Sequence, residues 1–116
     1  MNETNQMWET YRASWSNKNS AKRADELRRI TTDDFEYRDP NTELTGFEQL
    51  SDYMSQFQKE FVGASFVITD FIVHHDRSLS YWNMVNSENE VVINGADFAT
   101  YENGKLKQIT GFFKEG

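Results

Sequence analysis

The feature that most constrains the fold is a series of strand-like runs, separated by short polar turns, in the second half of the chain. The runs cover residues 65–75, 79–86, 91–101 and 105–114. The dipeptide Asn103-Gly104 separates the last two, and it is a strong hairpin signal because a type I′ turn needs positive φ at both central residues. The sequence therefore predicts a four-stranded antiparallel meander.

The first part of the chain predicts two helices. Aromatic residues recur at helical spacing within residues 4–17, which indicates an amphipathic helix with one aromatic face, formed by Trp8, Tyr11 and Trp15. A face of this kind is typical of a helix that packs on a core. Ser20 is the expected N-cap of a second helix, which continues to residue 30.

A third helix and a short strand complete the predicted elements. Thr45 and Glu48 match the capping box T-x-x-E at the start of the helix, and Gly63 is its expected stop. A short strand over residues 35–38 precedes it. Helices followed by a meander are the α+β pattern, and no repeat, low-complexity tract or linker interrupts residues 1–116, so one domain is expected.

Composition limits the classes of function. The formal net charge of −7 argues against nucleic-acid partners, because backbone phosphates require clustered Lys and Arg. The chain has no cysteine, which excludes thiolate chemistry, and no apolar stretch long enough for a membrane span.

No signal peptide is visible, so a cytoplasmic location is expected. The sequence shows neither a Gly-rich phosphate loop nor a nucleophile elbow, and we expect no cofactor.

Two aspartates stand out as candidate site residues. Asp39 precedes Pro40, which biases it toward extended backbone at the end of the short strand. A buried carboxylate there could act as a general base, although Asp-Pro-Asn is also ordinary turn chemistry. Asp97 lies in an apolar run, where a carboxylate is costly unless it is protonated or paired. With the opposite strand face inside, Asp97 would instead point to solvent.

Three further side chains are candidates for the same site. His74 and His75 are adjacent in a strand, so they face opposite sides, and one of them could enter a cavity as an acid or base. The alternative places that histidine on an outer face or at a dimer contact. A metal site needs about three converging ligands, so we expect no metal. Tyr11 is either a core residue or a hydroxyl donor to an acid such as Asp97.

The order of short motifs along the chain resembles a known superfamily. The motifs are Tyr37-Arg38-Asp39-Pro40, Thr45-Gly46, Phe61-Val62-Gly63-Ala64-Ser65-Phe66, His74-His75-Asp76, Asn94-Gly95-Ala96-Asp97-Phe98, Asn103-Gly104-Lys105-Leu106 and Gly111-Phe112-Phe113. Together they look like the nuclear transport factor 2-like (NTF2-like) superfamily, and most of all like bacterial SnoaL-like proteins. The resemblance covers nearly the whole chain. It implies an α+β, cystatin-like cone with three N-terminal helices packed on the concave face of a curved, mostly antiparallel sheet.

For the ketosteroid isomerase branch of this superfamily, the resemblance implies roles for individual residues. Its general base lies in an Asp-Pro string that matches Asp39-Pro40. Its oxyanion-hole aspartate matches Asp97 if one residue is inserted near Tyr101, and its oxyanion-hole tyrosine matches Tyr11. The chain departs from that branch by a longer segment before Asp39 and by its histidine pair. The resemblance also implies a homodimer through the outer sheet face.

Sequence and resemblance together favour a protein with a small-molecule cavity. We expect a cofactor-independent acid–base enzyme of isomerase, cyclase or dehydratase type that acts on a small, largely apolar carbonyl compound. Asp39 would abstract a proton, and protonated Asp97, with Tyr11 or one histidine, would hydrogen-bond the enolate. The alternatives are a non-catalytic ligand-binding or dimeric interaction module, and a structural adaptor whose interior is filled. The expected cavity wall consists of Trp15, Tyr37, Phe57, Trp82, Met84, Phe98 and Phe112.

Overall fold

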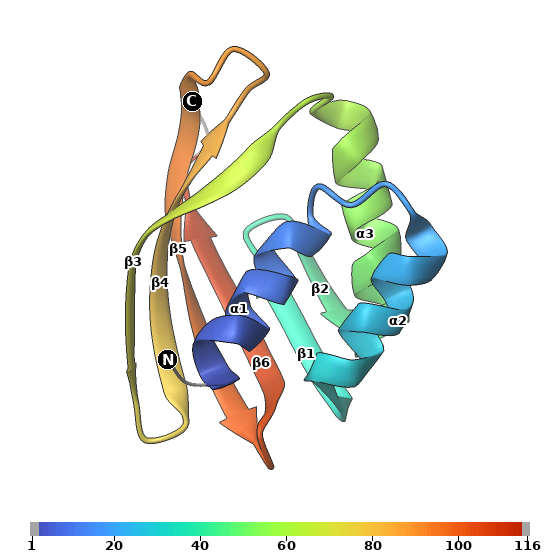
Figure 1. Ribbon diagram of the computed structural model, residues 1–116, viewed down its shortest axis with the longest axis vertical. Coiled ribbons are helices and arrows are strands. Elements are labelled where there is room, and N and C mark those ends of the chain that lie inside the picture. Colours follow the sequence, from blue (N-terminus) through green and yellow to red (C-terminus); the bar gives the residue numbers. More distant parts are fainter. Residues whose placement is uncertain (1–2, 115–116) are drawn as a thin grey trace.

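The computed structural model describes residues 3–114, which form three helices and six strands (Figure 1). The helices are α1 Glu3–Ser14, α2 Ser20–Ile30 and α3 Gly46–Glu60. The strands are β1 Thr31–Asp39, β2 Thr42–Thr45, β3 Ser65–His74, β4 Arg77–Val85, β5 Val91–Glu102 and β6 Lys105–Phe113. Within these residues, no helix has the length and apolar character needed to cross a membrane.

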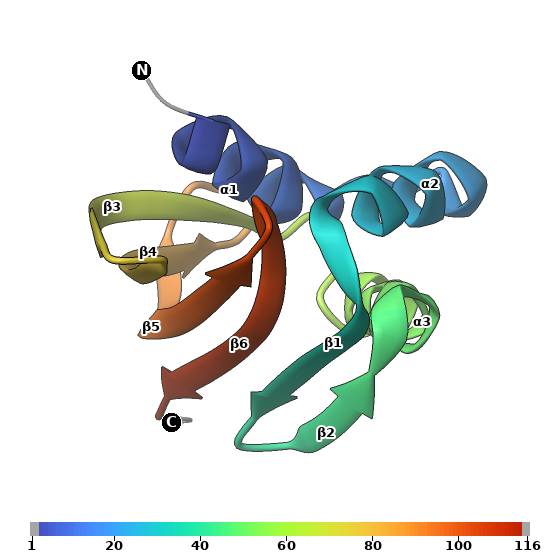
Figure 2. The same cartoon turned by 90° about the horizontal axis from the view of Figure 1, so that it is seen from below.

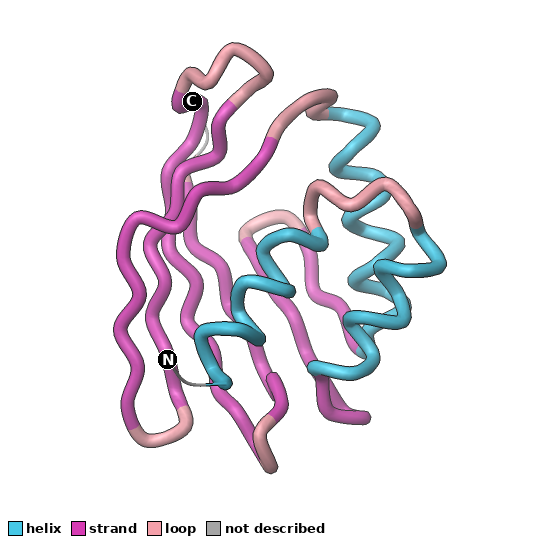
Figure 3. The backbone as a smooth tube through the Cα atoms, viewed as in Figure 1, coloured by secondary structure: helices cyan, strands magenta, loops and turns pink. Residues whose placement is uncertain are grey.

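The strands form one sheet in the order β2-β1-β6-β5-β4-β3. Neighbours are antiparallel except β1 and β6, which run parallel. The predicted meander is β3 to β6, and its long strands stand side by side in Figure 3. Figure 2 shows the sheet bending, with α1 across the inner side of the meander and α2 and α3 beside β1 and β2.

The first strand region differs from the prediction. The strand expected over residues 35–38 extends over Thr31–Asp39, and the unpredicted β2 pairs with it as a hairpin. Because this hairpin separates α2 from α3, the expectation of three N-terminal helices is corrected: two helices precede the sheet and the third follows β2. The cause is that Thr31 and residues 36–38 pair with β6, which places this strand inside the sheet.

The helix starts differ in detail from those predicted. Asn19, rather than Ser20, caps α2, and its side-chain oxygen accepts a hydrogen bond of 3.1 Å from a backbone N–H of the first turn. Thr45 is the N-cap residue of α3, but its side chain makes no capping bond. Its own N–H donates instead to Gln49 Oε1 at 2.8 Å, which takes the place of the predicted capping box.

Two-residue turns join the long strands. Asn103 and Gly104 have φ of 53° and 76°, so the positive φ predicted at both positions is confirmed. His75 and Asp76 form the β3–β4 turn with φ of 46° and 61°. That turn starts earlier than predicted, because Arg77 already pairs with β3.

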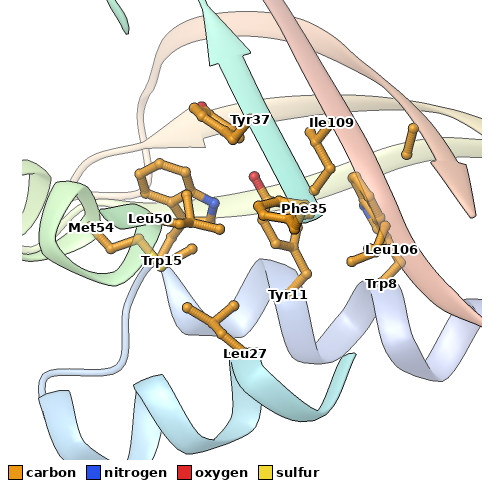
Figure 4. Close-up of a cluster of buried hydrophobic side chains, with 11 residues drawn as sticks. Trp8, Tyr11, Trp15, Leu27, Phe35, Tyr37, Leu50, Met54, Leu106 and Ile109 are labelled. Atoms are coloured by element: carbon orange, nitrogen blue, oxygen red, sulfur yellow. The ribbon is translucent and has the colours of Figure 1, made fainter. Parts of the chain in front are cut away.

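The core lies where the aromatic face of α1 meets the sheet and the other helices. Figure 4 shows this cluster, which consists of Trp8, Tyr11, Trp15, Leu27, Phe35, Tyr37, Leu50, Met54, Ala99, Leu106 and Ile109. Burial of a large apolar side chain contributes roughly 1.5–3 kcal/mol, so the aromatic face holds α1 against the sheet. The indole Nε1 of Trp8 also donates to Ser80 Oγ on β4 at 3.1 Å.

Arg23 of α2 is buried, which is unusual for a charged side chain. Only 1% of its surface is exposed. Its guanidinium group donates to the Ser51 hydroxyl and carbonyl oxygens at 3.0 Å each, to the Asn17 carbonyl at 2.7 Å, and to Ser55 Oγ. Arg23 therefore ties α2 to α3 through neutral acceptors.

Candidate active site

A cavity of about 130 Å³ lies between the helices and the inner face of the sheet. Side chains from α1, α3, β1 and the four meander strands line it. Ten of the 21 lining residues are aromatic, namely Trp8, Tyr11, Trp15, Tyr37, Tyr53, Phe57, Phe61, Phe66, Trp82 and Phe113. The interior is thus open enough to hold a small molecule, and its apolar walls favour one with apolar surface.

Asp39, the last residue of β1, lines this cavity. Its carboxylate accepts hydrogen bonds from the hydroxyl groups of Tyr37 at 2.7 Å and Tyr53 at 3.0 Å. The backbone N–H of Asn41 donates to its other oxygen at 2.8 Å. Asp39 therefore closes the β1–β2 turn and, at the same time, presents its carboxylate to the cavity.

Asp97 lines the same cavity from the middle of β5. Its side chain is half-buried. The carboxyl group lies deep in the protein, so the exposed part of the side chain faces the cavity. Burial raises the pKa of Asp97 from 3.8 to about 7; the Trp82 indole lowers it, and the charge of Asp39 raises it further. Among residues 3–114, no Lys, Arg or His forms an ion pair with Asp97.

Gly111 lies between the two acids. It pairs with Asp97 across β5 and β6, and the parallel pairing of β1 with β6 brings Asp39 to its other side. A Cβ at position 111 would lie 2.8 Å from Asp97 Oδ1 and 3.5 Å from Asp39 Cβ. Because glycine has no side chain, both acids can face one cavity.

Tyrosine hydroxyl groups surround the acids. Tyr11 projects its hydroxyl from α1 toward β1 and β6 (Figure 4). Burial raises the pKa of Tyr11 well above its usual range; the charge of Asp97 raises it further, and the Trp15 indole lowers it. Burial likewise raises the pKa of Tyr37, and the nearby Tyr11 and Asp39 raise it further. These phenols therefore stay protonated near neutral pH and act as hydrogen-bond donors.

The indole nitrogen of Trp82 is a buried donor without a partner. Trp82 is 9% exposed and lines the cavity, and Nε1 has no hydrogen bond within the described residues. It lies close enough to Asp97 to lower the pKa of that carboxyl group. A buried unsatisfied donor costs roughly 1–3 kcal/mol. An acceptor on a ligand in the cavity would relieve that cost.

The cavity opens to solvent at one end. We call this end the entrance, and define it by the exposed lining residues Asn41, Gln56, Glu60 and Phe61. Tyr53 lies just inside it, and the carboxylates of Asp39 and Glu60 both raise its pKa, after the larger effect of burial. Glu60 is exposed, Asp39 is half-buried and the carboxyl group of Asp97 lies deepest, which gives the order of the acids from the entrance inward.

The structure brings most of the predicted site residues together. Asp39, Asp97 and Tyr11 face one cavity. Five of the expected wall residues also line it, namely Trp15, Tyr37, Phe57, Trp82 and Met84. Their roles in chemistry remain predictions.

Two expected wall residues lie outside the cavity. Phe98 is 39% exposed and Phe112 is 60% exposed. Phe98 follows Asp97 and Phe112 follows Gly111, and neighbouring residues in a strand face opposite sides of the sheet. Because Asp97 and Gly111 face inward, both phenylalanines face outward, and Phe113 takes the inner position.

The two histidines also lie outside the cavity. His74 ends β3 and His75 begins the β3–β4 turn, and both are exposed. Their Nδ1 atoms lie 3.1 Å apart, so the rings contact each other rather than Asp97. The expectation that one of them enters the cavity is wrong. β3 ends at His74, and His75 already belongs to the turn, so both side chains lie at the end of the sheet and away from the cavity. Within the described residues, no group of three or more His, Asp or Glu is placed to hold a metal ion.

Sequence reasoning missed several cavity residues. Tyr53 was overlooked, although it precedes Phe57 by four residues and so shares its side of α3. Gly111 and Phe66 stand out in the sequence only as parts of the family motifs. No local signal identifies Gly111 as the contact between the acids, because that contact depends on the pairing of β1, β6 and β5.

The fold has close counterparts among solved structures. A candidate isomerase of the SnoaL-like family from Agrobacterium tumefaciens aligns with a TM-score of 0.90 and 19% identity, over 98% of this chain and 99% of that one. A candidate SnoaL-like polyketide cyclase from Jannaschia aligns with a TM-score of 0.71 and 17% identity, over 95% and 86%. A protein with a ketosteroid isomerase-like fold from Catenulispora acidiphila, in complex with trimethylamine, aligns with a TM-score of 0.76 and 14% identity, over 93% and 85%.

At these identities the likeness shows the fold alone, and the fold is the expected nuclear transport factor 2-like one. A search of curated protein sequences gave no match. A family model of the SnoaL-like domain matches residues 8–109. The match covers most of the sequence, and the chain therefore belongs to the SnoaL-like domain family.

Proposed function

We propose that this protein is a cofactor-independent acid–base enzyme of isomerase, cyclase or dehydratase type, which acts on a small carbonyl compound held in the cavity. The observation that carries the proposal is the pair of acids, Asp39 and Asp97, which face one cavity on either side of Gly111. Burial raises the pKa of Asp97 to about 7, and proton transfer is most efficient when such a pKa lies near the working pH.

In the proposed reaction, the carboxylate of Asp39 takes a proton from the carbon next to the carbonyl group. The electron pair of that C–H bond moves to the carbonyl oxygen and forms an enolate. Protonated Asp97 and the hydroxyl of Tyr11 donate hydrogen bonds to this oxygen, and Trp82 Nε1 is a third available donor. If the substrate carries a C=C bond next to the deprotonated carbon, the enolate is conjugated with it, and return of the proton to the far carbon of that bond would complete an isomerisation.

The comparisons support the class of the reaction. The family includes proteins named as isomerases and polyketide cyclases, and the fold of this chain matches candidates of both kinds. The relative from Catenulispora was solved with trimethylamine, so a protein of this fold binds a small organic molecule. These likenesses favour small-molecule chemistry over a purely structural adaptor, and the open cavity points the same way.

Exchange of ketone α-protons with deuterated water tests the proposal without a known substrate. We expect the protein to accelerate exchange for at least one small ketone in a panel followed by NMR. Asp39→Asn should reduce the acceleration by about 10²–10⁴-fold. Asp33→Asn, at an exposed position of β1, is the control with the same charge change and should retain full activity. Undiminished exchange with Asp39→Asn would remove Asp39 from the mechanism.

The second candidate function is a ligand-binding module without catalysis. The observation that favours it is the hydrogen bonding of Asp39, whose oxygens already accept bonds from Tyr37, Tyr53 and the Asn41 N–H. These contacts can serve to fix the turn and the cavity wall. Tight ligand binding without α-proton exchange in any ketone would support this module over the enzyme.

We also propose a homodimer that forms through the outer face of the sheet. Apolar side chains are exposed on that face on neighbouring strands, namely Val67, Ile72, Tyr81, Phe98 and Phe112. Contiguous exposed apolar surface of this kind marks interaction sites in many proteins. The cavity lies on the opposite face, so dimerisation would leave its entrance free.

A further inference from the structure

The negative charge of the cavity has no cationic partner within the described residues. Asp39, Asp97 and Glu60 all line the cavity, and none of them forms an ion pair among residues 3–114. The three groups that donate hydrogen bonds to Asp39 are neutral. Because burial favours the protonated form of Asp97, the unbalanced negative charge lies at the entrance, on Asp39 and Glu60, in a chain with a net charge of −7.

Arg12 is the one arginine or lysine among the cavity-lining residues of the described chain, and its side chain is already engaged. Its Nη1 donates to the Phe66 carbonyl oxygen at 3.0 Å. Its Nε and Nη2 donate to Glu9 Oε1 at 3.0 Å and 2.6 Å. Glu9 thus balances the charge of Arg12, and the carboxylates of the cavity remain without a counter-charge.

The side chains around the inner edge of the entrance are aromatic. Tyr53 donates a hydrogen bond to Asp39 at 3.0 Å, and Glu60 lies two turns further along the same side of α3; all three residues line the cavity. The ring centroids of Trp15 and Tyr37 are each 5.9 Å from that of Tyr53. Aromatic faces attract cations through the negative charge above the ring, and quaternary ammonium groups are bound in this way.

We propose that the entrance of this cavity binds the ammonium group of a small organic cation, held between the Asp39 and Glu60 carboxylates against the ring of Tyr53. The inference rests on the proposed function in that it takes the cavity as the substrate site, and it names the class of substrate. Carboxylates attract any cation, but the aromatic wall favours an alkylated ammonium over a strongly hydrated metal ion.

The size of the cavity sets the size of the ligand. A cavity of about 150 Å³ in another protein binds benzene, so the 130 Å³ here suits a molecule of roughly that size. With the ammonium group at the entrance, the remainder of such a molecule would extend toward Asp97 and Tyr11. A carbonyl group at that end would meet the donors of the proposed reaction.

Three probes of matched shape separate charge from shape. They are choline, its neutral tert-butyl isostere in which carbon replaces nitrogen, and the corresponding tert-butyl carboxylate anion. All three tryptophans, Trp8, Trp15 and Trp82, line the cavity, so their indole N–H signals in NMR titrations report binding inside it. We expect choline to bind at least about tenfold more tightly than the neutral isostere, and the anion to bind most weakly.

Variants then locate the charge. Glu60→Gln, at an exposed position, should weaken choline binding by roughly two- to fivefold, because exposed charge pairs are partly screened. Asp39→Asn should weaken it by about tenfold or more, because that carboxylate is less exposed. Both should leave the affinity for the neutral isostere within about twofold. Asp33→Asn, remote from the entrance and equal in charge change, should alter neither affinity.

Each outcome decides between the two proposals. Tighter binding of choline that both entrance variants weaken supports the organic-cation site. Equal or tighter binding of the neutral isostere overturns it, while the cavity remains a ligand site as the proposed function requires. Strongest binding of the carboxylate also overturns it. Failure of all three probes to shift any indole signal counts against the cavity as a ligand site, and therefore against both proposals.

Discussion

Replacing Asp97 by Asn is expected to stabilise the protein above neutral pH and to leave its stability near pH 4 almost unchanged. Asp97 lines the cavity with no ion-pair partner in the described chain, and burial raises its pKa from 3.8 to about 7. Above that pH the folded protein must hold a buried carboxylate. Asparagine has nearly the same shape and carries no charge, so it avoids the cost of desolvating one.

The magnitude follows from the size of the shift. One pKa unit corresponds to about 1.4 kcal/mol, so a shift from 3.8 to about 7 sets an upper limit of about 4 kcal/mol. Asp97 is partly exposed toward the cavity, which reduces the cost of its charge, and we expect roughly 2–4 kcal/mol. The folded state binds the proton more tightly than the unfolded chain, so the stability of the wild type falls as pH rises from about 4 to 7 and then levels off.

Urea denaturation of the wild type and Asp97→Asn across this pH range measures the effect. The difference in free energy of unfolding should be near zero at about pH 4, grow toward neutral pH, and reach a plateau at about pH 8. A difference that does not change with pH would refute the reasoning. Carboxyl NMR titration gives the pKa directly, and Asp39→Asn should lower the pKa of Asp97 because it removes a nearby negative charge.

Three further predictions concern the stability of the protein and its dimer. Gly111→Ala should lower the free energy of unfolding by about 1 kcal/mol, because the new Cβ would lie 2.8 Å from Asp97 Oδ1 and must displace that carboxyl group. A gain in stability in urea denaturation would contradict the close contact. Arg23→Ala should lower the free energy of unfolding by roughly 1–3 kcal/mol in the same assay, since it removes the hydrogen bonds that join α2 to α3. Unchanged stability would show that these bonds contribute nothing. The wild type should have the mass of a dimer in light scattering at micromolar concentration. Phe112→Glu should give a folded monomer, because Phe112 is 60% exposed on the outer face. A wild-type monomer would exclude the dimer.

The strands of the meander could be predicted from sequence because their signals are local. The positive φ of Asn103 and Gly104 follows from the preference of those residue types, and each apolar run extends close to its predicted ends. β2 could not be predicted in the same way. Its four residues, Thr42–Thr45, are only partly buried and form a strand because β1 offers a pairing edge. A pairing partner of this kind is not visible in a local window.

The candidate site shows which part of the inference depended on chain topology. Phe98 and Asp97 were both expected in the cavity, yet adjacent residues in a strand cannot face the same side. Alternation alone could have excluded one of them, but it could not say which. The choice depends on the pairing of Asp97 with Gly111 and Ser80, which faces the carboxyl group inward. The shared cavity of Asp39 and Asp97 was expected from family resemblance, because local pattern leaves the face undecided.

The parallel pairing of β1 with β6 is what makes the site possible. Tyr37 pairs with Ile109 and Arg38 with Thr110, so the next residue, Asp39, arrives beside Gly111. A shift of one residue in this register would turn the side chain of Asp39 to the outer face, away from Asp97. The buried side chain of Tyr37 resists such a shift, because the shift would turn it to the outer face and expose it to water. The core of the protein therefore fixes the register, and the register places the two acids in one cavity.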